Sequence, residues 1–168
     1  IQSVQLCITT DPFMCGYDEV TEMSLAAIRR LNDAGIKCTT LTKGISPMAL
    51  ADLSDQNEYG ITLISLDEEY RRKVEPGSAT YRERIAAIKQ LHDAGCKTWV
   101  SIEPYPTPNL IEQDIFEILD TVSFTDRIIF GRTNYNKDVT AYKEHKHFYN
   151  QKAAEVIEFC KERGIQYH

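Results

Sequence analysis

The sequence predicts an α/β protein built on a parallel sheet. Short apolar runs rich in β-branched residues alternate along the chain with stretches whose apolar residues fall at helical spacing. A unit of helix, Ala-Gly and strand also recurs: AIRRLNDAGIK at 27–37 returns as AIKQLHDAGCK at 87–97, and a weaker copy occupies 156–165. Recurring helix–Gly–strand units are typical of βα units around a parallel sheet.

The first part of the chain is predicted to contain two strands and two helices. Residues 3–10 form an apolar run that stops at a Thr-Thr-Asp-Pro turn. A helix over 20–34 follows, with Gly35 as its C-terminal cap. The strand at 36–42 ends at a Lys-Gly pair, and a Ser-Pro pair begins a short helix over 46–53, with serine as the cap and proline in the first turn.

The middle of the chain begins with a buried strand at 60–67, which ends in polar residues. A short charged helix follows and stops at Glu75-Pro76-Gly77, because proline disfavours the helical conformation of the residue before it and glycine supplies the turn. The remaining elements are expected as a helix over 78–94 capped by Gly95, a strand over 96–103 halted by the prolines of 104–108, a helix over 110–119, a strand over 126–131, a helix over 145–163 and the start of a last strand over 165–168.

Length and composition limit the classes of protein. A chain of 168 residues suits one domain, residues 1–168, and its net charge of −6 argues against a broad nucleic-acid-binding face. No apolar run approaches the roughly 18 residues of a membrane helix. The five cysteines lack metal-ligand spacing, so we expect no metal site and a reducing cytoplasmic location. These patterns leave an open doubly wound sheet and an incomplete (β/α) barrel as alternatives.

Polar residues follow the predicted strands where those strands end. In both architectures ligands bind at the carboxyl ends of parallel strands. The ends carry Thr10, Asp11, Lys43, Ser65, Asp67, Glu103 and Arg132. Each has an ordinary alternative role, such as helix capping by Asp11 and Asp67 or simple solvation of Lys43. Together they predict a converging site. No Gly-x-Gly-x-x-Gly or Gly-Lys-Ser/Thr loop is present, which argues against a Rossmann or Walker nucleotide site.

Four turns and one helix carry a family resemblance. The strings Thr-Thr-Asp-Pro at 9–12, Leu-Thr-Lys-Gly at 41–44, Ile-Ser-Leu-Asp at 64–67, Glu-Pro-Gly at 75–77 and the helix at 84–95 resemble the spore photoproduct lyase-like branch of the radical S-adenosylmethionine enzymes. The similarity covers about residues 4–108. It implies a partial (β/α)6 barrel of parallel strands. It also implies a [4Fe–4S] cluster on a CxxxCxxC loop, which cleaves S-adenosylmethionine to a 5′-deoxyadenosyl radical that abstracts a substrate hydrogen.

The resemblance also sorts the strand ends. Thr10 and Asp11 would meet the amino group of the cofactor, Lys43 would pair with its carboxylate, and Ser65 would lie near its ribose or methionine part. The resemblance also implies, on weaker grounds, that Glu103 and Arg132 face the cofactor or the substrate. No catalytic residue is assigned.

The cluster loop is absent from this sequence, since Cys7 and Cys15 flank the first turn at the wrong spacing. The chain also begins with Ile1, directly inside a strand pattern. We therefore expect a fragment without the first strand and helix of the barrel, catalytically inactive and binding no cofactor alone. The parent would need a flavodoxin- or ferredoxin-type reductant. The exposed strand at 4–10 is expected to pair with another chain or copy.

Two other functions compete with this interpretation. One is a lyase or hydrolase that uses Asp11, Lys43 and Glu103 for acid–base chemistry, and the other is a non-enzymatic ligand-binding domain. A separate stretch, 132–152, mixes basic residues with aromatic ones, Tyr135 among them, and could contact a nucleic-acid substrate. Its ordinary alternative is a solvated loop that leads into a helix.

Overall fold

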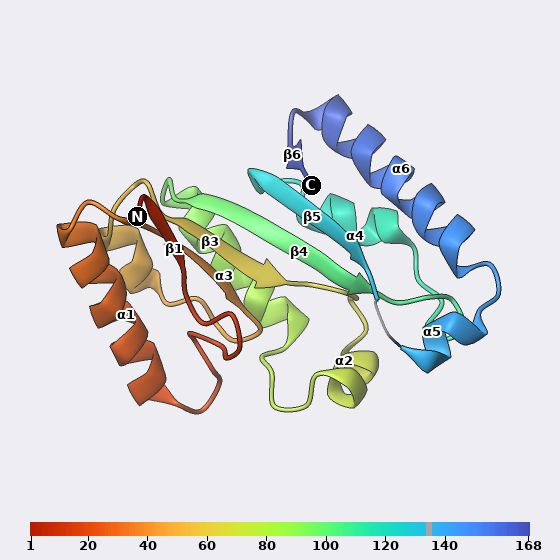
Figure 1. Cartoon of the computed structure of the whole chain (residues 1–168), viewed down its shortest axis with the longest axis horizontal. Helices are drawn as coiled ribbons and strands as arrows, with labels where there is room; N and C mark the ends of the chain where they lie inside the picture. Colours follow the sequence, from red (N-terminus) through yellow and green to blue (C-terminus); the bar gives the residue numbers. More distant parts are fainter. Residues whose placement is uncertain (134–135) are drawn as a thin grey trace.

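A single sheet of six parallel strands organises the protein. The computed structural model describes residues 1–133 and 136–168. The strands are β1 (Ser3–Gln5), β2 (Lys37–Thr42), β3 (Glu58–Thr62), β4 (Lys97–Tyr105), β5 (Arg127–Arg132) and β6 (Gln166–Tyr167). They lie in the sheet in their order along the chain, and every pair is parallel (Figure 1).

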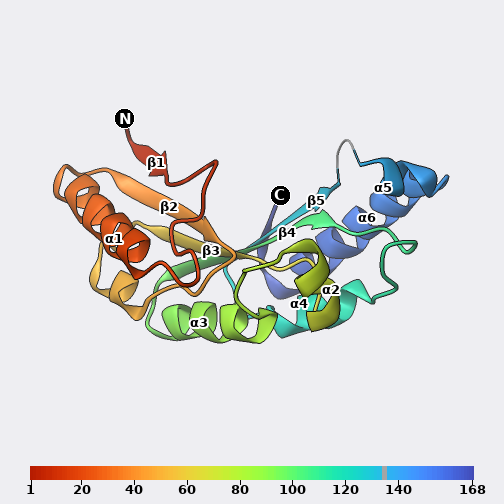
Figure 2. The same ribbon diagram turned by 90° about the horizontal axis from the view of Figure 1, so that it is seen from below.

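Helices connect the strands. They are α1 (Asp18–Asp33), α2 (Glu68–Val74), α3 (Tyr81–Asp93), α4 (Ile115–Thr121), α5 (Lys137–Ala141) and α6 (His145–Arg163), with one 3-10 turn, η1 (Met48–Asp52). Figure 2 shows the sheet curved like part of a barrel wall, with α1, α3, α4 and α6 outside it.

The strand order decides between the two architectures that the sequence left open. A doubly wound sheet reverses its strand order at a switch point and places helices on both faces. Here the order never reverses, so successive right-handed crossovers place their helices on one face. The protein is an incomplete barrel, as predicted, and its concave face lies on the side away from these helices.

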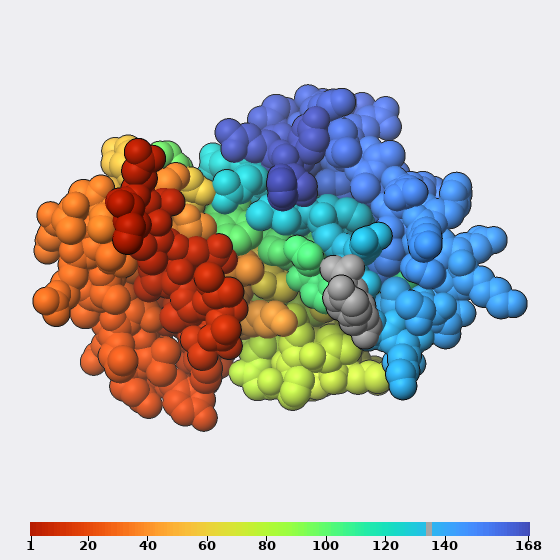
Figure 3. Space-filling view, in the orientation of Figure 1, coloured from red at the N-terminus to blue at the C-terminus, as the bar shows by residue number. Residues whose placement is uncertain are grey.

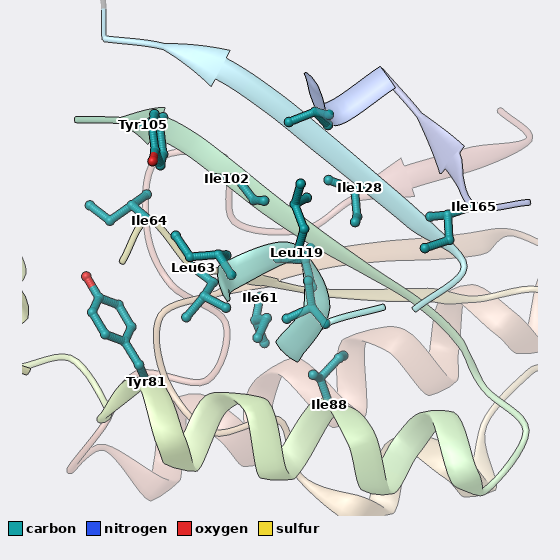
Figure 4. Close-up of a cluster of buried hydrophobic side chains, with 14 of the residues drawn as sticks. Ile61, Leu63, Ile64, Tyr81, Ile88, Ile102, Tyr105, Leu119, Ile128 and Ile165 are labelled. Carbon is teal, nitrogen blue, oxygen red and sulfur yellow. The ribbon is translucent and has the colours of Figure 1, made fainter. Parts of the chain in front are cut away.

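The core fills the space between the sheet and the outer helices. Ile61, Ile102 and Ile128 project from three strands toward Ile88 and Leu119 of two helices, and none of the five is measurably exposed (Figure 4). Period-2 alternation along each strand therefore sends the intervening residues to the concave face.

Both boundaries of the third strand differ from the sequence prediction. The strand predicted over 60–67 is β3, which begins at Glu58 and ends at Thr62. Beyond it, the Asp67 amide donates to Ser65 Oγ at 3.1 Å, and the Asp67 carboxylate accepts from the Tyr70 amide at 2.7 Å as the N-cap of α2. These local bonds replace ladder pairing.

The prolines after β4 do not stop it where the sequence suggested. The strand continues past Glu103 to Tyr105, with a register shift in its pairing to β5 between Ile102 and Tyr105. Such irregularities are where a strand tolerates proline. Helix α4, predicted from 110, begins only at Ile115 because the Asp114 side chain caps it. Helix α5 was not predicted.

The first strand is shorter than the predicted 3–10. Pairing with β2 covers Ser3–Gln5, and Cys7 then takes a left-handed conformation with φ of 55°. In the described sheet β1 is an edge strand. Pairing of residues 4–10 with another chain stays a prediction. Among the described residues, none of the helices has the length and apolar character needed to cross a membrane.

Candidate functional site

A hollow lies at the carboxyl ends of four adjacent strands. We call it the strand-end hollow; its volume is about 260 Å³. Lys43, Ile64, Pro104 and Thr133 line it from the ends of β2, β3, β4 and β5. Helix α2 and the turn after it add Tyr70, Lys73, Val74 and Glu75, and Leu110, Asn136 and Asp138 complete the wall. This is the end of a parallel sheet where ligands bind.

One buried glutamate organises the charges of the strand-end hollow. Glu75 Oε1 lies 3.0 Å from Lys43 Nζ, and Glu75 Oε2 accepts a 2.8 Å hydrogen bond from Arg84 Nη2. The Glu75 side chain is 2% exposed and that of Lys43 is 45% exposed. The Lys43 contact lacks hydrogen-bond geometry, so Oε1 receives no hydrogen bond within the described chain. The lysine head is thus held beside the glutamate while it faces the hollow.

Arg84 is the inner partner of Glu75. It is completely buried, yet each of its three donor nitrogens has an acceptor: the Ala79 carbonyl, the Thr62 carbonyl and Glu75. Its guanidinium also lies 5.0 Å from the Tyr81 ring centroid. A hydrogen bond from each guanidinium nitrogen, together with the Glu75 charge, makes this buried cation tolerable.

The Glu-Pro-Gly turn brings Glu75 back to the end of β2. Helix α2 ends at Val74, and Gly77 takes a positive φ of 81°, which glycine adopts at little cost. The chain then returns so that the Ala79 amide donates to the Lys43 carbonyl at 2.9 Å. This motif therefore fixes the backbone of Lys43 as well as its side chain.

Asp11 ties the first turn to the end of β2. Its carboxylate accepts from the Thr42 hydroxyl at 2.5 Å, from the Lys43 amide at 2.6 Å and from the Phe13 amide at 2.9 Å. Gly44 completes the junction, since a Cβ there would lie 1.7 Å from the Phe13 carbonyl oxygen. Asp11 does not cap α1, and Thr10 beside it is exposed.

The other predicted site residues lie outside the strand-end hollow. Ser65 is completely buried and lines a neighbouring hollow that includes Gln113 and Asp114. Glu103 is exposed on β4, and its side chain covers Gly131 of β5. Arg132 is exposed and lines a third hollow with α5 and α6. Tyr135 lies outside the described residues.

A second glutamate between two cations lies at the opposite, amino end of the sheet. Glu58 accepts from Lys37 at 3.1 Å and from Arg127 at 2.8 Å. Partial burial raises the pKa of Glu58, but the bonds from Lys37 and Arg127 outweigh it and the pKa is lowered. Trp99 stacks nearby over Gly60, with the Arg127 guanidinium 5.2 Å from its ring.

Sequence reasoning missed the roles of Glu75 and Arg84. In the sequence, Glu75 stands out only as part of a turn motif, and Arg84 only as part of a helix. A signal was present for Arg84: it lies three residues after Tyr81 and four before Ile88, on the same buried stripe of α3. A cation on an apolar stripe needs a buried anion.

No metal-binding cluster is found in the part of the chain that the structure describes: three His, Cys, Asp or Glu side chains do not converge anywhere. All five cysteines are free, and Cys7 and Cys15 are half-buried while Cys38 and Cys160 are buried. These residues do not form a set of thiolates that could hold an iron–sulfur cluster.

A curved parallel sheet with helices outside it places the chain in the βα-barrel class, in which ligands bind at the carboxyl ends of the strands. Sequence comparison identifies the family. Residues 3–122 match the Radical SAM superfamily, and the chain belongs to that superfamily.

Two uncharacterized proteins are similar in sequence. One, from Methanocaldococcus jannaschii, is 31% identical over 101 residues, which are 60% of this chain and 37% of that protein. The other, from Acidianus two-tailed virus, is 21% identical over 123 residues, 71% of this chain and 40% of its own length. The chain thus spans less than half the length of these relatives.

Two solved enzymes are similar in fold. A mutant spore photoproduct lyase with bound AdoMet and dinucleoside spore photoproduct superposes with a TM-score of 0.64 at 19% identity, covering 86% of this chain and 44% of that chain. Streptococcus suis SuiB bound to S-adenosylmethionine gives a TM-score of 0.60 at 15% identity, covering 98% of this chain and 36% of that chain. The predicted partial barrel of the radical S-adenosylmethionine type is confirmed.

Proposed function

We propose that this chain forms the S-adenosylmethionine-facing wall of a radical SAM barrel and that Lys43 binds the carboxylate of the cofactor. The observation that carries the proposal is the half-exposed Lys43 ammonium, anchored at the carboxyl end of β2 by the buried Glu75. An ammonium has three donors and suits a carboxylate as a point charge. Glu75 occupies one side of it, so the side toward the hollow is available to a ligand.

The residues of the strand-end hollow fit the methionine part of S-adenosylmethionine, which carries one carboxylate and one ammonium. Lys43 and Lys73 offer positive charge, and Asp138 offers a carboxylate. We assign Thr10 and Asp11 to the wall near the amino group of the cofactor. Asp11 would act by shaping the turn, because its carboxylate already accepts three hydrogen bonds.

Ser65, Glu103 and Arg132 are assigned more peripheral positions. The Ser65 hydroxyl is buried and bonded to the Asp67 amide, so we propose that it shapes the end of β3 near the cofactor. Glu103 would reach a ligand across Gly131, since its exposed side chain lies over that glycine. Arg132 would contact the cofactor or the substrate from the side of helices α5 and α6.

The [4Fe–4S] cluster of the superfamily does not fit the described residues, because no cysteine set converges. We propose that the chain alone is inactive and holds no cofactor tightly. The whole protein would act in the cytoplasm with a flavodoxin- or ferredoxin-type reductant and abstract hydrogen from a substrate for which a nucleic acid is our candidate.

The central experiment is anaerobic reconstitution of the full-length protein with iron and sulfide. We expect the absorption of a [4Fe–4S] cluster and, after reduction, release of 5′-deoxyadenosine from S-adenosylmethionine. An intact anaerobic preparation that forms no cluster would overturn the proposal.

A binding experiment tests Lys43 itself. In the reconstituted protein, Lys43→Met should weaken S-adenosylmethionine binding by about 10-fold or more, because it removes a charge-assisted contact. Lys73→Met, from the same hollow, is the matched control and should lose less. Decarboxylated S-adenosylmethionine should bind wild type and Lys43→Met about equally. If Lys43→Met weakens both ligands alike, Lys43 does not bind the carboxylate.

The acid–base alternative has less support. It needs Asp11, Lys43 and Glu103 in one site, yet of these only Lys43 lines the strand-end hollow. Turnover by the chain itself, abolished by Lys43→Ala and by Glu103→Ala, would favour it over our proposal. Tight binding of a small molecule without turnover would favour the ligand-binding domain.

A further inference from the structure

We propose that the hollow between the end of β5 and helices α5 and α6, the α5–α6 hollow, binds phosphate groups of a nucleic acid. The inference deepens the proposed function, since it gives the candidate substrate class a contact surface. Its test needs neither cofactor nor cluster, so the two proposals can fail separately.

The α5–α6 hollow has a lining suited to anions. Its volume is about 340 Å³, and it is separate from the strand-end hollow except for a shared wall at Thr133. Arg132 and Lys146 bring positive charge, His145 brings a titratable ring, and Thr140 and Asn150 bring neutral donors. No carboxylate is among its described lining residues. Phosphate oxygens accept hydrogen bonds from such side chains.

Charge is distributed unevenly along the chain, and this hollow lies in its basic part. Residues 132–152 contain five lysines and arginines against two acidic residues, whereas the whole chain carries a net charge of −6. The stretch is therefore at +3 and the remainder at −9. Helices α5 and α6 form one end of the molecule, on the opposite side from α1 (Figure 3). Segregation of this kind is the electrostatic footprint of a polyanion-binding surface.

Three lysines lie on α5, on α6 and in the turn between these helices. Lys137, Lys143 and Lys146 are exposed, and within the described residues none forms an ion pair. By contrast, Lys37, Lys43, Lys89 and Lys152 each lie within 3.1 Å of a carboxylate oxygen. Cations elsewhere, among them Arg30, Lys97 and Lys161, also form no ion pair within the described residues, but they lie far apart along the chain. Lys137, Lys143 and Lys146 differ in falling within ten residues of one another, and a local group of cations favours an external anion.

The floor of the α5–α6 hollow is held by buried contacts. Tyr149 is 5% exposed, and its hydroxyl donates to the Tyr105 carbonyl at 2.7 Å and accepts from the Thr133 amide at 3.3 Å. Phe148 stacks on the Tyr105 ring at 6.1 Å. The cations therefore project from a fixed platform that needs little ordering when a ligand binds.

The aromatic side chains argue less for base stacking than the sequence suggested. Tyr149 is buried and Phe148 packs against Tyr105 and Tyr142, so their rings serve the core. We therefore assign this surface to the phosphate backbone, whose contacts are independent of sequence.

The test is fluorescence anisotropy of labelled single-stranded and duplex oligonucleotides titrated with the protein over a range of salt concentrations. Wild type should bind, and the logarithm of its affinity should fall linearly with the logarithm of salt concentration. The variant Lys137→Gln/Lys143→Gln/Lys146→Gln should lose about 10-fold in affinity or more, and its salt slope should decrease by about 2 to 3.

The matched control removes three exposed cations elsewhere, Arg30→Gln/Lys97→Gln/Lys161→Gln, and should stay within about 2-fold of wild type, since these residues make no phosphate contact. Circular dichroism of both variants confirms folding. Equal losses in both variants, or no oligonucleotide binding by wild type, would overturn the inference. A mononucleotide or inorganic phosphate should compete poorly with the labelled oligonucleotide. If either one competes as well as an unlabelled oligonucleotide at the same concentration of phosphate groups, the hollow is a site for free phosphate and the inference is overturned. If the protein binds S-adenosylmethionine but not the oligonucleotides, the inference fails and the proposed function still stands.

Discussion

Two glutamates, each between two cations, lie at opposite ends of the same sheet. At the carboxyl end Glu75 lies between Lys43 and Arg84, and at the amino end Glu58 lies between Lys37 and Arg127. Both groups connect elements far apart in the sequence.

The two groups differ in burial and in how fully they are closed. Glu58 is one-fifth exposed and accepts good hydrogen bonds from both cations. Glu75 is buried beside the fully buried Arg84, and its bond to Lys43 is incomplete. The amino-end glutamate therefore has a hydrogen bond on each of its two oxygens and links three strands, although Arg127 Nε in the same group has no hydrogen-bond partner within the described chain. The carboxyl-end group has a buried carboxylate whose Oε1 accepts no hydrogen bond within the described chain, beside a half-exposed lysine that lines the strand-end hollow.

Replacing Glu75 should cause the largest loss of stability. Glu75→Leu leaves the Arg84 guanidinium buried without its anion, and loss of one partner of a buried pair costs about 3–5 kcal/mol. Urea unfolding should show this decrease in the free energy of unfolding. Glu58→Leu is the matched control and should lose only about 1 kcal/mol, because its cations can turn to water. Equal decreases in the free energy of unfolding for the two variants would contradict the difference in burial between the two groups.

The next largest loss of stability is expected for Gly60→Ala, because Gly60 is closely packed at the amino end of the sheet. A Cβ in Gly60→Ala would lie 2.3 Å from the Trp99 ring, which is 5% exposed, so overpacking should cost about 1–3 kcal/mol. Gly131→Ala is the control: its Cβ would meet the side chain of the exposed Glu103, which can move away. Thermal unfolding that ranks Gly131→Ala below Gly60→Ala in stability would contradict this account.

Lowering the pH should reduce the contribution of Glu58 to the stability of the protein. The pKa of Glu58 is lowered below its ordinary value of 4.5, since burial is outweighed by the bonds from Lys37 and Arg127. A carboxyl whose pKa is lower in the folded state binds its proton more readily when unfolded. Its contribution is thus complete above pH 4.5 and is lost as pH falls through the folded pKa. The stability difference between wild type and Glu58→Gln, measured from pH 7 to 3, should shrink over that window; a constant difference would argue against the assignment.

The smallest effect on stability is expected at Lys43. Its side chain is 45% exposed, and in Lys43→Met the Glu75 carboxylate keeps Arg84 as its partner. The free energy of unfolding should change by less than about 1 kcal/mol. A loss as large as that of Glu75→Leu would mean that Lys43 serves the fold, and would remove the basis for assigning it to a ligand.

Much of the fold could be predicted from the sequence because its information is local. The repeat of 27–37 at 87–97 corresponds to the α1–β2 and α3–β4 units, and Gly35, Gly95 and Gly164 follow helices that end within two residues of them. The end of β3 and the start of α4 differ from the prediction, since side chains there bond to nearby backbone in place of a continued strand or helix. The end of β1 differs because Cys7 leaves the extended conformation.

The site was predicted less well because it depends on which face of the sheet each side chain takes. Lys43 follows β2, Glu103 lies within β4 and Arg132 is the last residue of β5. They line or cover different places, because a shift of one residue along a strand moves a side chain to the opposite face. The partner of Lys43 comes from a turn 32 residues later, and no local pattern links Lys43 to Glu75.

The uneven distribution of charge has a consequence for how the protein meets other molecules. A surplus of +3 over 132–152 and of −9 over the rest gives the molecule a permanent electrical polarity. In the field of a polyanion the protein would turn so that α5 and α6 lead, and the acidic remainder would be held away. Encounters in the wrong orientation would be rejected before contact, and the association rate would fall as salt is added.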